Sequence, residues 1–125
     1  MSRYINYNAN PVNNRVGDCV IRAISKVLNQ DWDTTYAGIC LEGFIHYDMP
    51  SSNFVWSQYM ARKGFRRKSV ETDVLTINEF CESHPKGSFL LCTDGHVVAS
   101  IDGSYCDTWD SGNEIILYFW ERKED

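Results

Sequence analysis

The sequence predicts an α+β fold, with helices in the first half of the chain packed on a C-terminal antiparallel β-meander. Three observations support this prediction. Apolar residues between Cys19 and Leu28 recur at helical spacing. The C-terminal third changes to short β-rich runs separated by glycine-containing turns. No repeat or linker interrupts the 125 residues, of which 43% are hydrophobic, so residues 1–125 are expected to form a single domain.

The expected helices begin at recognisable capping residues. Asp18 precedes the first apolar stretch and Asp33 precedes the second, so each is a candidate N-cap. Thr76 and Glu79 have the spacing of a capping box. The helices are therefore expected at 19–28, from a cap at 33 through 44, at 53–63, and from 76 to a point before Pro85. The first of them is expected to pack across the sheet.

The expected strands are 65–70, 88–92, 96–101, 104–109 and 114–120. Asp102-Gly103 between two apolar runs is a strong signal for a two-residue hairpin turn. With these residues in the central turn positions, the register places His96 opposite Trp109. Since side chains alternate between the two faces of a strand, His96 and Asp107 are expected on the same face.

The charge balance and the cysteine pattern argue against several classes of protein. Twelve Lys and Arg against 17 Asp and Glu give a formal net charge of -5, so no basic face for nucleic acid is expected. Five cysteines without a closely spaced pair predict neither a disulfide framework nor a zinc site, and we expect no metal and no cofactor. No stretch resembles a signal peptide or a membrane span, so we expect a cytoplasmic protein with no membrane partner.

Cys19 is the candidate nucleophile because it lies at the start of the first expected helix. A helix N-terminus presents unpaired N–H groups and the positive end of the helix dipole, both of which stabilise a thiolate. Gly17, two residues earlier, permits a tight turn and a close backbone approach. Cysteine is also a common core residue, and core packing is the interpretation we give to the other four cysteines.

His96 is the candidate base, because it begins an expected strand far along the chain from Cys19. Simple packing at a strand start is the alternative interpretation. Asp107 shares its face, where a carboxylate is unusual unless it orients the imidazole and stabilises the imidazolium. Asp110 would point to the opposite face if the strand continued, but it lies beyond the expected strand end. A turn there can bring Asp110 to the imidazole of His96 instead. Both acids remain candidates.

Three short motifs carry these residues: GDCVIRAI at 17–24, DGHVVA at 94–99 and DTWD at 107–110. Their order resembles that of a small papain-like cysteine peptidase domain. It is similar to short uncharacterised phage and bacterial members of that superfamily and to the peptidases that process double-glycine leader peptides. The resemblance implies a papain-like fold in which Cys19 is the nucleophile, His96 the base and Asp107 the orienting acid.

The resemblance also implies an oxyanion residue. Papain-like enzymes carry a glutamine six residues before the nucleophile, and Asn13 occupies that position here. A side-chain amide there would stabilise the negative charge that acyl transfer places on the substrate oxygen. The asparagines between Asn10 and Asn14 also fit plain turn chemistry, and both interpretations stay open.

Two functions follow as hypotheses. The first is a cysteine peptidase, or an amide or isopeptide hydrolase, that uses a Cys19–His96–Asp107 triad on a peptide or protein substrate. The alternative is a catalytically silent papain-like fold that binds a protein partner as an inhibitor or adaptor. The aromatic content of 14% suits either a core or a contact surface.

Overall fold

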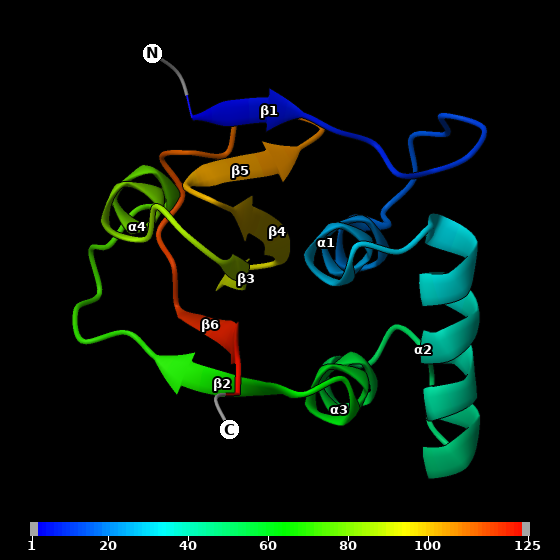
Figure 1. Ribbon diagram of the computed structural model, residues 1–125. Helices are drawn as coiled ribbons and strands as arrows, with labels where there is room; N and C mark the ends of the chain where they lie inside the picture. Colours follow the sequence, from blue (N-terminus) through cyan, green and yellow to red (C-terminus); the bar gives the residue numbers. More distant parts are fainter. Residues whose placement is uncertain (1–2, 124–125) are drawn as a thin grey trace.

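The computed structural model describes residues 3–123, which form four helices and six strands (Figure 1). In chain order these are β1 (Tyr4–Asn6), α1 (Cys19–Leu28), α2 (Trp32–His46), α3 (Asn53–Arg62), β2 (Phe65–Ser69), α4 (Ile77–Ser83), β3 (Ser88–Thr93), β4 (His96–Ile101), β5 (Ser104–Asp107) and β6 (Tyr118–Arg122). The predicted α+β class is confirmed.

The six strands form one sheet in the order β1-β5-β4-β3-β6-β2. Only β3, β4 and β5 make the predicted meander, because β6 pairs with β3 and not with the preceding strand β5. The expectation of a continuous meander was therefore wrong at its last strand. The segment before β6 instead follows α4, where Ile77 N donates to Glu114 O at 3.0 Å and Asn78 N donates to Gly112 O at 3.0 Å.

Helices cover both faces of the sheet (Figure 1). Alternate residues of β3 and β4, such as Leu90 and Ala99, pack with α1 and α3 on one side. Their neighbours Leu91 and Val98 pack with α4 on the other. As predicted, α1 lies across β4, whereas α2 packs on α1 and α3. The prediction that the helices precede the sheet was incomplete, since α4 follows β2 in the chain.

The helix starts depend on caps that differ in part from those predicted. Asp18 occupies the N-cap position of α1 but makes no capping hydrogen bond. The cap of α2 is Asp31 and not Asp33, because Thr34 N donates to Asp31 Oδ1 at 2.8 Å and Asp33 lies inside the first turn. The capping box of α4 between Thr76 and Glu79 is confirmed.

The hairpin between β4 and β5 has the predicted register. Asp102 and Gly103 have φ values of 48° and 82°, the left-handed pair that a tight hairpin turn requires. Ile101 pairs with Ser104 and, two residues further along each strand, Ala99 pairs with Cys106. The strand ends differ from those predicted: β5 stops at residue 107 rather than 109, and β6 begins at residue 118 rather than 114.

One strand was not predicted. β1 pairs with β5 in parallel and extends the sheet on the side opposite β2. It brings the N-terminal segment past the end of β5, where Tyr7 N donates to Asp107 O at 2.8 Å. This contact places the loop that leads into α1 beside the C-terminal end of β5.

Candidate active site

Three segments meet where β4 begins and β5 ends, and each contributes one candidate residue. Cys19 is the first residue of α1, His96 the first of β4 and Asp107 the last of β5. The hairpin register fixes the positions of His96 and Asp107, while the packing of α1 on β4 and β5 brings Cys19 to them. The residues predicted from separate motifs are thus brought together.

His96 and Asp107 form a direct pair, with His96 Nε2 donating to Asp107 Oδ2 at 2.7 Å. The carboxylate is buried and has further donors: Ser111 Oγ at 2.7 Å and the backbone N–H of Thr108 at 2.8 Å. Burial alone would raise the pKa of Asp107, but His96, Ser111 and Thr108 together hold it below the usual value. Asp107 is therefore a fixed anion against the ring.

Arg22 is a third element of this cluster that the sequence analysis did not identify. It is buried in α1, forms an ion pair with Asp18, and places a second guanidinium nitrogen 3.6 Å from Asp107 Oδ1. The available signal was an arginine that interrupts the apolar run from Val20 to Ile24. A buried charge of this kind is normally paired, so it pointed to a buried acid nearby.

Cys19 interacts with the other side of the imidazole. Burial opposes ionisation of the thiol, but the hydrogen bond with His96, the backbone N–H of Val97, and the charges of His96 and Arg22 hold the pKa of Cys19 below its usual value. Because Nε2 already donates to Asp107, Nδ1 is the ring nitrogen left for the sulfur.

The pKa of the His96 imidazole shifts in the opposite direction, upward. Burial lowers the pKa of His96, but the hydrogen bonds and negative charges of Asp107 and Cys19 outweigh burial and raise that pKa to about 9. A lowered thiol pKa beside a raised imidazole pKa favours the thiolate–imidazolium pair over the neutral pair. The thiol therefore has the electrostatic setting of a nucleophile.

Asp110, the alternative orienting acid, has other partners. Its Oδ1 accepts hydrogen bonds from the hydroxyl of Tyr105 and, at 3.1 Å, from the backbone N–H of Gly112. Asp107 is thus the acid that the hairpin brings to His96. Trp109, predicted opposite His96, lies with its ring centroid 5.2 Å from that of the imidazole and covers it on one side.

The N-terminal asparagines combine turn chemistry with proximity to the site. Asn13 has a left-handed φ of 56°, and its Oδ1 accepts from Asn8 Nδ2 at 3.3 Å. Its role as the oxyanion residue stays a prediction. Asn14 lines two of the cavities near the start of α1. Its amide is a second candidate donor beside the first-turn N–H groups of α1, which have no acceptor within the helix.

Gly17 does not have the role expected from the sequence. A Cβ at this position would meet no atom within 4 Å, so no backbone approaches it closely. Its φ is also outside the left-handed region adopted by Gly95 and Gly103. The absence of a side chain at Gly17 leaves open space two residues before Cys19.

The other cysteines differ from Cys19. Burial raises the pKa of Cys81 and of Cys106, and raises that of Cys92 to about 12. All three are buried in the core. The thiol pKa of Cys19, in contrast, is lowered. The surroundings of Cys19 therefore favour the thiolate, whereas those of the three core cysteines favour the neutral thiol.

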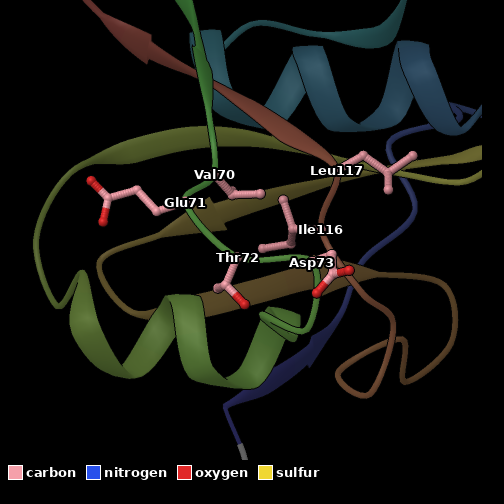
Figure 2. Close-up of a pocket in the computed structure, with 6 residues that line it drawn as sticks. All are labelled: Val70, Glu71, Thr72, Asp73, Ile116 and Leu117. Atoms are coloured by element: carbon pink, nitrogen blue, oxygen red, sulfur yellow. The ribbon is translucent and has the colours of Figure 1, made fainter.

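Several cavities surround Cys19. One of about 160 Å³ is lined by Cys19, His96 and Trp56, and one of about 570 Å³ lies between the start of α1 and α2. A third of about 330 Å³ adjoins Trp109 and Arg22. A depression of about 560 Å³ between the loop after β2 and the segment before β6 contains none of the triad residues; there the carboxylate of Glu71 extends away from Ile116 (Figure 2).

Across residues 3–123, no group of three or more His, Cys, Asp or Glu side chains is arranged to hold a metal ion. Within the same part of the chain, no helix is both long and apolar enough to cross a membrane. Comparisons of the chain with protein-family models, curated proteins and solved structures give no match.

Proposed function

We propose that this protein is a papain-like cysteine hydrolase that cleaves a peptide, isopeptide or related amide bond. The observation that carries the proposal is the contiguous thiol–imidazole–carboxylate arrangement of Cys19, His96 and Asp107. The charges of the pair fit this chemistry. The thiolate of Cys19, the nucleophile, and the imidazolium of His96, the proton donor, are both favoured.

The acylation step uses both members of the ion pair. The Cys19 thiolate attacks the carbonyl carbon, a C–S bond forms, and the carbonyl π electrons move to the oxygen. Collapse of this intermediate breaks the C–N bond, and the departing amine takes the proton from His96 Nδ1. Asp107 keeps the ring in the orientation in which Nδ1 faces the reacting atoms.

Deacylation returns the enzyme to its resting state. His96, now neutral, accepts a proton from water as the water oxygen attacks the thioester carbon. The C–S bond then breaks, the acid product leaves, and the thiolate–imidazolium pair is restored. The first-turn N–H groups of α1, with the amide of Asn13 or Asn14, are the donors available to the oxyanion in both steps.

The test is hydrolysis by the purified chain of internally quenched peptides and of an isopeptide-linked substrate, with products identified by mass spectrometry. We expect turnover that Cys19→Ala abolishes and that Cys40→Ala, a substitution in the body of α2, leaves unchanged. Absence of cleavage by the wild-type chain, together with no reaction with a simple activated thioester, would contradict the proposal.

A second candidate is the binding function, inhibitor or adaptor, and one observation favours it. The outer side of α2 and the turn after it expose large apolar side chains, including Phe44 at 74% and Tyr47 at 94% exposure. Exposed apolar patches of this kind often mark contact surfaces. If hydrolysis is absent, a partner whose binding survives Cys19→Ala and is lost in Phe44→Asp would support this alternative.

A further inference from the structure

We infer that two copies of this chain associate through the outer face of α2, as a dimer in which the two α2 helices lie antiparallel. This association is independent of hydrolysis. It gives the exposed apolar surface of α2 a defined occupant, a second copy of the chain, in place of a different protein.

The two sides of α2 have the reverse of the polarity that is usual for a surface helix. The helix lies at the edge of the molecule, with α1 and α3 on its inner side (Figure 1). Two of its buried residues, Thr35 and Glu42, are polar. In contrast, every exposed residue in the range 36–45 is apolar or aromatic. A surface helix normally turns its polar face to water, so α2 has the pattern of a helix that is covered.

The outer apolar face is continuous along the helix. Its centre consists of four residues with the spacing i, i+3, i+4 and i+7, here called the α2 stripe: Ala37, Cys40, Leu41 and Phe44. Tyr47, in the turn after the helix, extends the stripe, since its ring centroid lies 6.5 Å from that of Phe44. None of these side chains is charged, and charged side chains are likewise depleted at the centre of protein–protein interfaces.

The exposed apolar surface is large enough for a stable dimer. Six large side chains of α2 and the following turn contribute to it: Tyr36, Leu41, Phe44, Ile45, Tyr47 and Met49. With ~200 Å² for each fully exposed side chain, their exposed fractions correspond to roughly 800 Å². A dimer interface of standard size buries about 800 Å² on each partner, whereas the largest apolar patch of a typical monomer covers about 300–600 Å².

The stripe is also complementary to itself. In antiparallel helices, a two-fold axis between positions 40 and 41 places Phe44 of one copy opposite Ala37 of the other. The largest side chain of the stripe therefore meets the smallest, and Leu41 meets Cys40. Large side chains that face small ones let two helices interdigitate closely. Closed two-fold dimers are also the commonest oligomers of soluble proteins.

This association leaves the candidate active site open. The residues that line the 160 Å³ cavity at Cys19 and His96 come from α1, α3, the β3–β4 hairpin and β6. Contact through the outer face of α2 therefore does not cover the thiol. Association and hydrolysis are consequently tested by separate measurements, and either can fail without the other.

The test is analytical ultracentrifugation of the purified chain under reducing conditions, over a wide range of micromolar concentrations. We expect the mass to rise with concentration from the 14.4 kDa of one chain toward twice that value. A chain that stays monomeric at every concentration would overturn the inference and leave the surface of α2 to a different partner.

Variants locate the contact on the stripe. Leu41→Asp and Phe44→Asp alter side chains that are 58% and 74% exposed, and each should weaken association about 30-fold or more because a charge is buried at the interface. The matched control Val74→Asp changes a side chain of similar exposure, 65%, in the loop after β2 and should keep the dimer. Circular dichroism checks that each variant is folded. Association that survives both stripe variants would contradict the assignment.

An exchange of residues 37 and 44 tests the antiparallel arrangement. Ala37→Phe should weaken association because two large rings then meet, and Phe44→Ala should weaken it because the ring that faces Ala37 is lost. The double variant again places one large and one small side chain at each contact and should recover most of the lost affinity. A double variant that loses as much as the two single variants combined would overturn the antiparallel arrangement.

Salt dependence distinguishes the stripe from an ionic contact between copies. Asp33 and Asp48 are exposed near the two ends of α2, and the antiparallel arrangement brings these acids of the two copies toward each other. Added salt should therefore strengthen association, because it screens their repulsion. Association that weakens with salt would instead indicate contact between acidic residues and the basic residues 66–68 of another copy, and would contradict the inference.

Discussion

Within residues 3–123, two clusters each join a histidine and an arginine to a buried carboxylate, and only one of them is a candidate catalytic site. In the first, His96 Nε2 donates to Asp107 at 2.7 Å with Arg22 beside the carboxylate. In the second, His46 Nε2 lies 2.9 Å from Glu42 Oε2, and Arg62 Nε donates to Glu42 Oε1 at 2.8 Å. We call them the Asp107 cluster and the Glu42 cluster.

The two clusters differ in what the histidine faces. In the Asp107 cluster the second side of His96 meets a thiol at a helix N-terminus and a cavity. In the Glu42 cluster His46 packs edge-on against Phe54, with ring centroids 5.2 Å apart, and Arg62 links α3 to α2. A histidine–carboxylate pair is therefore not by itself a candidate catalytic site. The Asp107 cluster is a candidate because a thiol and a cavity that can admit a substrate lie beside the pair.

The largest difference is expected from removing the two histidines. His96→Ala should slow alkylation of Cys19 by iodoacetamide at pH 7 by about 30-fold, because a thiol without this partner returns toward the ordinary pKa of ~8.5 and only a few per cent of it is thiolate at pH 7. His46→Ala should leave that rate unchanged. Alkylation rates are measured by mass spectrometry of the Cys19 peptide, and similar losses in both variants would contradict the distinction.

A smaller difference is expected from the two carboxylates. Asp107→Asn should lower the Cys19 alkylation rate about 10-fold, because the ring remains but is less well oriented and less well stabilised as the imidazolium. Glu42→Gln should leave the rate unchanged and lower the melting temperature by about 5 °C, because the buried carboxylate charge that Arg62 and His46 contact is lost. Thermal unfolding and alkylation measured on both variants give the comparison.

The stability effect of Glu42 has a defined pH dependence. The hydrogen bond with Arg62 holds the pKa of Glu42 below its usual value, although burial opposes this. A lowered folded pKa means that the contribution is complete above the unfolded value of ~4.3 and disappears as the pH falls through the folded value. The difference in melting temperature between wild type and Glu42→Gln should therefore narrow in acid.

The smallest effect is expected from the arginines. Arg22→Met should raise the pKa of Cys19 and slow its alkylation at pH 6 about threefold, because one favourable charge is removed. Arg22→Lys keeps a cation and should restore most of the rate, whereas a purely structural role for the side chain would show no such rescue. Arg62→Met should leave the alkylation rate unchanged.

Local sequence signals predicted the parts of the fold that depend on neighbouring residues. The capping box at Thr76 and the Asp102-Gly103 turn were predicted correctly because each is encoded within a few residues. The turn also fixed the register that brings His96 to Asp107. This is why two members of the candidate triad could be paired from sequence.

The errors involve contacts between distant segments. β1 has only three residues, too few to show a period, and its pairing with β5 spans most of the chain. The placement of β6 beside β3 depends on the contacts of residues 112–115 with α4, which no local pattern encodes. Asp18 was expected to cap α1, but its side chain is used by Arg22 and Trp32, and the distant Trp32 could not be foreseen.

The most direct test of the central claim, that Cys19 and His96 form an activated ion pair, is the pH dependence of Cys19 alkylation. It is measured site by site in the wild type, in His96→Ala and in His46→Ala. Because the pKa of Cys19 is lowered, the wild-type rate should reach half its maximum below pH ~8.5, the value for an unperturbed thiol. His96→Ala should move that midpoint to higher pH, and His46→Ala should not. A wild-type midpoint near ~8.5 that His96→Ala leaves in place would contradict the account.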